Sequence, residues 1–389
     1  MMFLGYRYKF VNWNKVRLSK EIIMKKIFFI INCFSAGGGA ESLLTQIVNH
    51  LNPKKYEIGI MEIIHDSIKT EPVNSNIKIY PYYVKADDPV RKSKMYHVYH
   101  EWDKVIQEFI PQDYDLYVSF NYLKPTFLLP KGKKCISWIH GDVYNLEQPN
   151  LAEEKALQNE AFRKANRIIT ISDITTQSVL DLFPEHKDKL QMICNGIDTG
   201  KVREKAKEHT EVQLQHPALL SVGRLDSNKN PLRMLDVFDK VYRENDKVHL
   251  YYLGYGNLEK DVVRVAIERG IDKNVHLLGY HDNPFPIIAQ CDVSCMFSLS
   301  EGFPMVLLES VALDKPFVSS VIGGSRILAN EQRCGKTMET DEEAANAILE
   351  FLRTDKEKIA KECRESIKRF ELKEYMRQIE TLFDEVMGE

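Results

Sequence analysis

The chain has 389 residues, a hydrophobic share of 44%, a charged share of 28% and a formal net charge of −3, a composition ordinary for a soluble globular protein of two domains. The nearly balanced charge gives no global electrostatic footprint for nucleic-acid binding. The seven cysteines form no C-x-x-C pair, and the nearest spacing, Cys291 to Cys295, has no histidine at metal-ligand spacing, so reduced thiols in the cytosol are expected.

Residues 1–23 are basic and aromatic without clear periodicity, whereas "MKKIFFIINCF" begins at Met24 as a cytosolic α/β protein commonly begins. We therefore expect translation to start at Met24, or residues 1–23 to form a loosely held extension; a basic arm that contacts a membrane is the functional alternative. The apolar run at 27–34 is too short for a bilayer span of ~18–20 residues and lacks a signal-peptide pattern. It predicts a buried parallel strand.

Predicted strands and helices alternate along almost the whole chain, which is typical of parallel sheets covered on both faces. We expect a Rossmann-like domain at 24–198, a second one at 199–371 and an amphipathic helix at 372–389 that needs an apolar surface to cover. Two doubly wound domains place a ligand-binding cleft between the carboxyl ends of their sheets. The predicted strands are 27–33, 58–64, 116–120, 135–139, 167–171, 217–223, 248–253, 275–278, 293–297 and 316–320.

Two glycine-rich loops match part of a dinucleotide fingerprint, G-x-G-x-x-G. In "FSAGGGAES" (34–42), Gly39 fits but Ser42 occupies the last position; in "GYGNLE" (254–259) the last position is Glu259. The first loop follows a strand and opens a helix, so its backbone N–H groups suit an anion, and a plain turn is the alternative for both loops. The two incomplete fingerprints disfavour a dehydrogenase.

A polar loop with two cations follows the strand predicted at 217–223. In "SVGRLDSNKNP", Arg224 and Lys229 stand just beyond the carboxyl end of that strand. A planar guanidinium fork and an ammonium point charge together suit a diphosphate. A solvated loop with two unrelated cations is the alternative.

The stretch "LSEGFPMVLLES" carries Glu301 and Glu309 at the two ends of an otherwise apolar run. Pro304 is expected to be the first helical residue, so Gly302 and Phe303 lie on the loop before the helix, where free N–H groups can hold phosphate. Glu309 then falls on the second turn. A capping carboxylate and a buried, satisfied glutamate are the alternative.

Two further motifs bear on chemistry. "SWIHGD" places His140 just after a predicted strand, at a carboxyl edge, although a lone histidine is more often structural than catalytic. "DYD" (113–115) imitates a D-x-D metal site, but it precedes the strand at 116–120 and so lies at the edge away from the cleft. No metal is expected there.

Together these stretches resemble the retaining GT-B glycosyltransferases of family GT4, over roughly 25–389. "EGFPMVLLE" is similar to the E-x7-E motif of that family, and "GRLDSNK" to its arginine–lysine diphosphate clamp. "GGAE", "HGD", "NGID" and "LGYH" follow in the expected order. One departure is "GGSRIL", which has Ile327 near a position where the family often has glutamate.

The resemblance implies a role for each matching residue. Arg224 and Lys229 would neutralise the diphosphate, Glu301 would bind the donor sugar, and Glu309 would bind ribose hydroxyls. Tyr280 would line the base pocket, Gly39 would approach the phosphates or the acceptor, and His140 would face the reacting sugar. The terminal helix at 372–389 would pack back on the first domain. The implied catalytic residues are His140, Glu301, Arg224 and Lys229, and the implied donor-binding residues are Gly39, Arg224, Lys229, Tyr280, Glu301, Gly302, Phe303, Pro304 and Glu309.

The implied activity is retaining hexosyl transfer from a nucleotide-diphosphate sugar, with a UDP-sugar expected, to a hydroxyl of a glycan or lipid-linked glycan. Capsule, exopolysaccharide or lipopolysaccharide synthesis is the implied setting. The fixed cations would hold the charge of the leaving group, so neither a cofactor nor a metal is expected. A non-hydrolysing sugar-nucleotide epimerase and a catalytically silent sugar-nucleotide-binding subunit remain alternatives.

Two basic stretches suggest a second kind of partner. "RKSK" (91–94) and "KPTFLLPKGKK" (124–134) combine cations with apolar residues, and such stretches can rest on an anionic membrane near a lipid-linked acceptor. Ordinary solvated faces are the alternative. The expected location is therefore cytoplasmic, with peripheral contact on the inner face of the cell membrane as the further hypothesis, and no nucleic-acid partner is expected.

Overall fold

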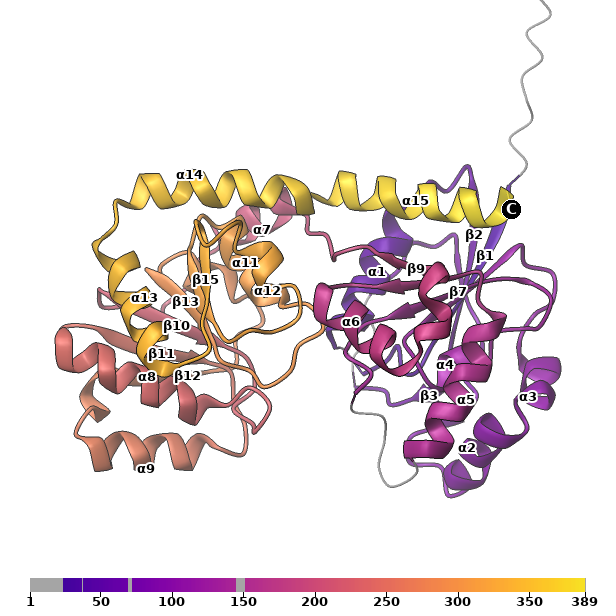
Figure 1. Ribbon diagram of the computed structural model, residues 1–389, viewed down its shortest axis with the longest axis horizontal. Helices are drawn as coiled ribbons and strands as arrows, with labels where there is room; N and C mark the ends of the chain where they lie inside the picture. The colour runs from indigo at the N-terminus through magenta and orange to yellow at the C-terminus, as the bar shows by residue number, and fades with distance from the viewer. Residues whose placement is uncertain (1–23, 37, 69–71, 145–150, 389) are drawn as a thin grey trace, which may run out of the picture.

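The computed structural model describes residues 24–36, 38–68, 72–144 and 151–388. It contains two α/β domains, each built on a parallel sheet covered by helices, and a pair of consecutive helices runs along both domains (Figure 1). This architecture confirms the predicted α/β class with two Rossmann-like domains. The extension predicted at 1–23 lies outside the described residues.

The first domain has a seven-stranded sheet of order β4-β2-β1-β6-β7-β8-β9, parallel at every neighbouring pair. A two-stranded sheet, β3 (Ile64–His65) with β5 (Val84–Lys85), lies beside it. The strands of the large sheet are β1 (Lys25–Ile31), β2 (Tyr56–Glu62), β4 (Ile77–Ile79), β6 (Leu116–Phe120), β7 (Lys134–Ile139), β8 (Arg167–Thr170) and β9 (Leu190–Met192). The helices are α1 (Gly39–His50), α2 (Arg91–His100), α3 (Trp102–Phe109), α4 (Lys124–Phe127), α5 (Leu151–Lys164), α6 (Asp173–Leu182) and the 3-10 helix at Pro184–Lys189.

The strand β1 shows why a continuous apolar run suits the centre of this sheet. Ile27, Phe29 and Ile31 join one buried cluster, whereas Phe28 and Ile30 join another on the opposite face. Side chains alternate between the two faces of a strand, so every position of a strand that is covered on both faces is buried and favours an apolar residue. Because β1 pairs in parallel with both β2 and β6, the carboxyl ends of these strands lie at one edge.

The second domain repeats the plan with a six-stranded parallel sheet of order β12-β11-β10-β13-β14-β15. Its strands are β10 (Ala218–Val222), β11 (His249–Leu253), β12 (Val275–Gly279), β13 (Val293–Met296), β14 (Phe317–Ser319) and β15 (Gly335–Thr337). Its helices are α8 (Pro231–Glu244), α9 (Glu259–Arg269), α10 (Phe285–Ile288), α11 (Met305–Ala312), α12 (Ser325–Leu328), α13 (Asp341–Arg353), α14 (Lys356–Ile367) and two 3-10 helices at Asp272–Asn274 and Lys368–Phe370.

Two chain segments connect the domains side by side. The segment that leads to α7 (Thr199–Lys205) carries Ile197, whose N–H donates to Phe370 O at 2.8 Å, and Leu372 N donates to Ile197 O at 2.9 Å. From there α15 (Leu372–Gly388) continues the line of α14 over the first domain (Figure 1). Its Phe383 meets rings of the first domain at 6.3 Å between centroids.

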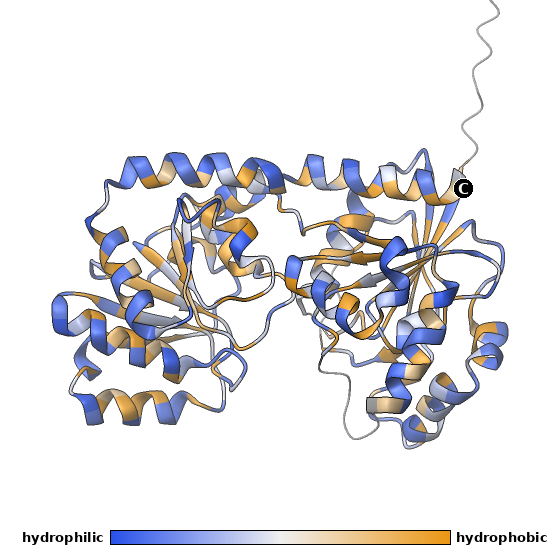
Figure 2. Cartoon of the chain, in the orientation of Figure 1, coloured by the Kyte–Doolittle hydropathy of each residue, from blue (hydrophilic) through white to orange (hydrophobic). Residues whose placement is uncertain are grey.

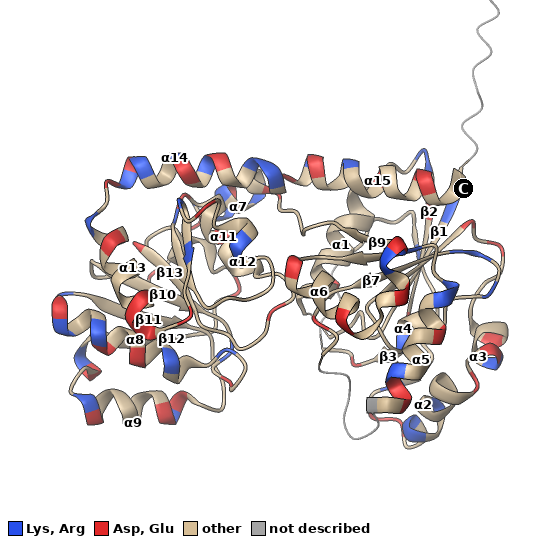
Figure 3. Cartoon of the chain, viewed as in Figure 1, with Lys and Arg blue, Asp and Glu red and all other residues tan. Residues whose placement is uncertain are grey.

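Apolar colour gathers in the strands at the centre of each domain, and hydrophilic colour dominates the outer sides of the helices (Figure 2). Lysine and arginine are interspersed with aspartate and glutamate over both domains (Figure 3). Among the described residues, no helix combines the length and the apolar character that crossing a membrane requires.

Candidate functional site between the two domains

The loop after β10 holds the two predicted cations in different environments. Gly223 has a φ of 146°, a backbone conformation that favours glycine. Asp226 organises the loop, because its carboxylate accepts from Lys229 N at 2.9 Å and lies 3.0 Å from Arg224 Nε. The Arg224 side chain is largely exposed, whereas that of Lys229 is mostly buried.

The loop that precedes α11 packs against this cationic loop. Lys229 Nζ donates to Glu301 Oε1 at 2.5 Å. The two backbones are also tied, since Leu299 N donates to Asn228 O at 2.8 Å and Asn228 Nδ2 donates to Ser300 O at 3.1 Å. The structure therefore brings the predicted diphosphate clamp and the first glutamate of the E-x7-E stretch into direct contact.

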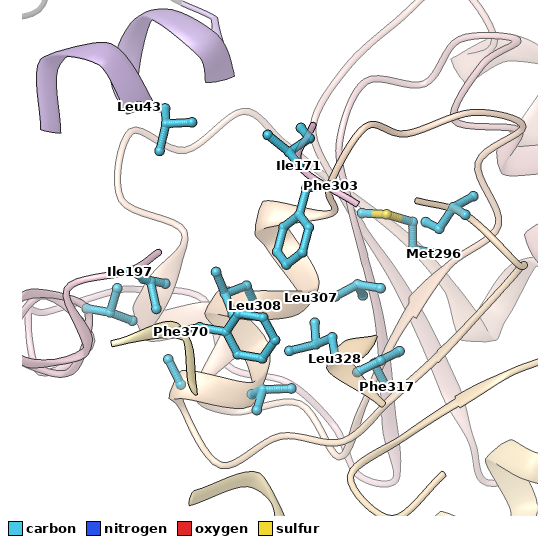
Figure 4. Close-up of a cluster of buried hydrophobic side chains, with 14 of the residues drawn as sticks. Leu43, Ile171, Ile197, Met296, Phe303, Leu307, Leu308, Phe317, Leu328 and Phe370 are labelled. Carbon is cyan, nitrogen blue, oxygen red and sulfur yellow. The ribbon is translucent and has the colours of Figure 1, made fainter. Parts of the chain in front are cut away.

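The start of α11 differs by one residue from the expectation. Pro304 is the residue before the helix, with a φ of −82° and a ψ of 84°, and Met305 is the first helical residue. The Pro304 carbonyl already accepts hydrogen bonds from Leu307 N and Leu308 N, so proline serves as the cap. The buried Phe303 ring lies beside Ile171 of the first domain (Figure 4) and near Phe370, from the segment that leads back to that domain.

Glu309 lies on the second turn of α11, as predicted from the position of the helix. Burial raises the pKa of its carboxyl from an ordinary 4.5 to about 7, because a charged carboxylate is poorly solvated there. Glu309 as a residue is half-buried, and no hydrogen bond or ion pair of its carboxyl occurs among the described residues. A side chain in this state has full hydrogen-bonding capacity left for a ligand.

Three loops at the carboxyl ends of β10, β11 and β12 lie together. Gly254 N donates to Gly279 O at 2.7 Å, and a Cβ on Gly254 would lie 2.0 Å from Gly223 O. Tyr280 on the third loop is 63% exposed and forms an edge-to-face pair with Tyr255, at 6.1 Å between centroids. Sequence reasoning missed Tyr255, although it stands inside the glycine loop at 254–259, where the glycines drew the attention.

His140 stands on the first domain, directly after β7. The centroid of its ring lies 4.1 Å from that of the Phe120 ring and 6.0 Å from that of the Trp138 ring. Burial lowers the pKa of its imidazole to about 3, so the ring is neutral at physiological pH. Its Nε2 atom is buried and has no hydrogen-bond partner among the described residues.

Gly39 is the first residue of α1, and Gly38 precedes the helix with an extended backbone. A Cβ on Gly39 would meet nothing within 4 Å, so the helix N-terminus faces open space there. In contrast, a Cβ on Gly38 would lie 2.5 Å from Glu41 Oε2. The structure thus leaves room at Gly39 for a ligand to approach the N–H groups of the first turn.

The first domain meets the second at the loop that carries Glu301. A Cβ on Gly302 would lie 2.0 Å from His140 O, so the two backbones touch at this glycine. Nearby, Gly324 N donates to Asp173 Oδ1 at 3.1 Å. The sequence offered no signal for this pair, because its partners stand 151 positions apart. Ile327, the departure from the family pattern, lies on α12 just beyond this contact.

A second hydrogen bond joins the domains beside the same loop. Ser300 Oγ donates to Asp142 Oδ2 at 2.6 Å. Asp142 follows His140 by two positions and Ser300 directly precedes Glu301, so this bond links the histidine loop to the glutamate loop. Asp142 and Ser300 both stand in stretches that the sequence analysis quoted, "HGD" and "LSEGFPMVLLES", but no role was predicted for either residue.

The D-x-D look-alike lies elsewhere. Asp115 accepts from Lys26 N at 2.8 Å, and Asp113 pairs with Lys26 Nζ at 3.0 Å, at the amino end of β6. Both carboxylates therefore bind Lys26 of β1. Within the described ranges no group of three or more histidine, cysteine, aspartate or glutamate side chains is arranged to hold a metal ion.

Two family models match consecutive parts of the chain. The model described as Glycosyltransferase Family 4 matches residues 37–201, and the model described as Glycosyl transferases group 1 matches residues 202–370. Between them they cover both domains.

Curated relatives carry related descriptions. The N-acetylgalactosamine-N,N'-diacetylbacillosaminyl-diphospho-undecaprenol 4-alpha-N-acetylgalactosaminyltransferase of Campylobacter jejuni is 29% identical over 53% of this chain and 54% of the relative. The capsular polysaccharide biosynthesis glycosyltransferase CapH of Staphylococcus aureus is 26% identical over 38% of this chain and 40% of the relative. The matched parts thus span 54% and 40% of the lengths of these two relatives.

Solved structures share the fold over nearly the whole chain. Anabaena HepE in complex with UDP has a TM-score of 0.68 at 17% identity, with 93% of this chain and 100% of that chain covered. Sucrose-phosphate synthase from Thermosynechococcus elongatus has a TM-score of 0.73 at 14% identity, with 94% and 100% covered. At such identities the likeness shows the two-domain fold alone.

Proposed function

We propose, because this chain belongs to the glycosyltransferases of family 4, that it transfers a hexosyl unit from a nucleotide-diphosphate sugar to a hydroxyl of a glycan or lipid-linked glycan. Uridine is the proposed base. The relatives named for capsule synthesis and for an undecaprenol-diphosphate glycan support a role in making surface polysaccharides, and the UDP complex of a structural neighbour supports the base.

The observation that carries the proposal is the contact of Lys229 with Glu301 at the face where the domains meet. Cleavage of a sugar–diphosphate bond places negative charge on the leaving group and positive charge on the anomeric carbon. We assign the holding of the first charge to Lys229 and the exposed Arg224, because pre-placed cations of this kind lower the barrier. Glu301 is placed to accept from hydroxyls of the sugar.

The proposed reaction retains the anomeric configuration and needs no metal. The acceptor hydroxyl would attack from the face that the leaving diphosphate occupies, and a diphosphate oxygen would take its proton. Fixed cations replace the charge that a metal would supply in this scheme. Transfer that continues unchanged in excess EDTA, with a product of the same anomeric configuration as the donor, is the expected result.

A thermal-shift screen against sugar nucleotides, followed by donor hydrolysis, tests the proposal. A selective donor raises the melting temperature by mass action, and slow release of free sugar shows bond cleavage without any acceptor. A donor that binds but is never cleaved would identify a silent binding subunit. A donor that is converted into its epimer would identify an epimerase.

We further propose weak contact of the first domain with an anionic membrane, through charge alone. The apolar residues of the 124–134 stretch do not contribute, because Phe127, Leu128 and Leu129 are fully buried; the expectation that they would rest on the membrane is wrong. The cations of this region border a hollow of about 670 Å³, lined by Lys131, Lys133, Arg163, Lys164, Arg167 and Lys189 and also by the carboxylates of Asp103 and Glu160. Each cation near an anionic surface contributes about 1 kcal/mol.

Liposome co-sedimentation tests the membrane contact. Binding should increase with the fraction of phosphatidylglycerol and fall in the double variant Lys131→Glu/Lys133→Glu. The variant Lys240→Glu, which changes a half-exposed lysine of the second domain, is the control. Sedimentation that does not respond to anionic lipid would remove this part of the proposal and leave the transfer reaction untouched.

A further inference from the structure

Asp142 occupies a position between the two halves of the proposed site. Its Oδ2 atom accepts the 2.6 Å hydrogen bond from Ser300, the residue directly before Glu301. On its own domain it stands two positions after His140, beyond the carboxyl end of β7. The carboxylate is therefore fixed in direction by a residue of the other domain.

The other oxygen of this carboxylate has no partner. Asp142 Oδ1 is buried and forms no hydrogen bond with any described residue, and the same is true of His140 Nε2. A buried polar atom without a partner is costly, and more so when it belongs to a charged group. Two such atoms two positions apart, against the loop that carries Glu301, indicate a place where a polar ligand completes the bonding.

The chemistry of a carboxylate limits what this ligand can be. An ionised carboxylate only accepts hydrogen bonds, and it repels an anion, so the diphosphate is a poor partner. Sugar hydroxyl groups are donors, and the adjoining Glu301 is the residue proposed to hold the transferred sugar. The nearest donors that the proposed substrate can bring to Asp142 are therefore hydroxyls of the hexose itself.

We propose that Asp142 binds the transferred sugar, with Oδ1 accepting a hydrogen bond from a hexose hydroxyl while Ser300 holds Oδ2. This inference rests on the proposed function and assigns a specificity-determining residue within it. A site built to accept from a hydroxyl discriminates strongly against ligands that lack it. Asp142 therefore contributes to the binding of the sugar nucleotide and not to the binding of the nucleotide alone.

Calorimetric titration of three proteins tests the assignment: wild type, Asp142→Asn and Ser300→Ala. The probes are UDP-glucose, UDP-galactose, UDP-N-acetylglucosamine and GDP-mannose, and the parent nucleotide of the one that wild type binds most tightly. Asn can still accept from Ser300, but it can then turn only an amide NH2 toward the sugar. Ser300→Ala removes the hydrogen bond between Ser300 and Asp142 and keeps the carboxylate of Asp142.

Asp142→Asn should weaken the sugar nucleotide about 10- to 100-fold, the usual loss for a hydrogen bond to a charged group, and should leave the affinity for the parent nucleotide unchanged. Ser300→Ala should lose clearly less. Unchanged binding of the sugar nucleotide by Asp142→Asn would overturn the assignment. An equal loss of affinity in Ser300→Ala would also overturn it, because the loss of the Ser300–Asp142 hydrogen bond would then explain the weaker binding of both variants. If wild type binds none of the probes, the proposed function fails first, and this inference fails with it.

Discussion

Lys229 and Glu301 form a hydrogen-bonded ion pair of 2.5 Å although 72 positions separate them. Both side chains are mostly buried, with exposed fractions of 24% and 16%. When no sugar nucleotide is bound, the ammonium of Lys229 and the carboxylate of Glu301 neutralise each other. A bound sugar diphosphate offers Lys229 an anion and offers Glu301 hydroxyl donors, so the pair is placed to serve both parts of one ligand.

Lys229→Ala should reduce the rate of transfer by about 10²–10³-fold. This is the usual cost of removing one fixed hydrogen-bond donor that stabilises negative charge in the transition state. The loss also leaves Glu301 without its cation. Initial rates at saturating donor and acceptor measure the effect, with the melting temperature as a check on folding. The matched control is Lys240→Ala, which breaks a lysine–glutamate pair of the same 2.5 Å length on the surface of α8. Wild-type turnover in Lys229→Ala would count against the proposed clamp.

Glu309→Gln should stabilise the ligand-free protein in a manner that depends on pH. The pKa of Glu309 is raised from 4.5 to about 7 in the folded state, so the folded chain keeps a proton that the unfolded chain releases between these values. Stability linked to this group is present below pH ~4.5 and is lost as pH rises through about 7. The advantage of the glutamine variant should therefore grow over this window, by up to about 3 kcal/mol at about 1.4 kcal/mol per pKa unit.

Melting temperatures of wild type and Glu309→Gln at pH 5, 6, 7 and 8 provide the measurement. Glu385→Gln, which changes an exposed glutamate of α15, is the control. The same Glu309 variant should bind the parent nucleotide more weakly than wild type at pH 8, because an amide replaces the proposed acceptor of ribose hydroxyls. A stability difference that is constant over pH would show that burial does not perturb this carboxyl.

Gly302→Ala should impair transfer while nucleotide binding persists. A Cβ at this position would lie 2.0 Å from His140 O, so the domains could not keep their present contact. Misplacement of reacting groups by about 1 Å can cost about 10²-fold in rate, whereas Arg224 and Lys229 both lie on the second domain and stay together. Gly141→Ala is the control at the same contact, since a Cβ there meets nothing within 4 Å. Full activity in Gly302→Ala would show that the contact is not used.

Phe383→Ala should release α15 from the first domain. The ring is fully buried and packs edge-on against Phe29 and Tyr56, and truncation of a buried phenylalanine costs about 3–5 kcal/mol. Hydrogen exchange should speed up over 372–388 before the sheets are affected. The exposed-site variant Glu385→Ala is the control, and equal protection in both variants would contradict this role of the helix.

The apolar pattern predicted the large sheets because buried parallel strands are apolar on both faces. The strand expected at 116–120 is β6 (Leu116–Phe120), and most others are displaced by only one or two residues. The strands β3, β4, β5 and β15 were missed, since each has only two or three residues, too few for a recognisable apolar run. The exposure of the apolar residues in the 124–134 stretch was judged wrongly. A sequence of leucines beside lysines is the same whether the leucines face solvent or the core.

The site divides in the same way. Residues on one loop or one helix, such as Glu301 and Glu309, were visible because the spacing of a helix relates them. The pairing of Asp142 with Ser300 was not visible, because their hydrogen bond joins residues 158 positions apart across two domains, and no local pattern records such a pair. Tyr255 was within reach, as it adjoins a glycine loop that the sequence had marked.

The most direct test is a crystal structure of the protein soaked with the sugar nucleotide that it binds most tightly. The diphosphate should lie within hydrogen-bonding distance of Lys229 Nζ and Arg224, with the sugar against Glu301 and the ribose hydroxyls at Glu309. A ligand bound at any other place, with Lys229 and Glu301 still paired as they are without it, would contradict the proposed transfer site.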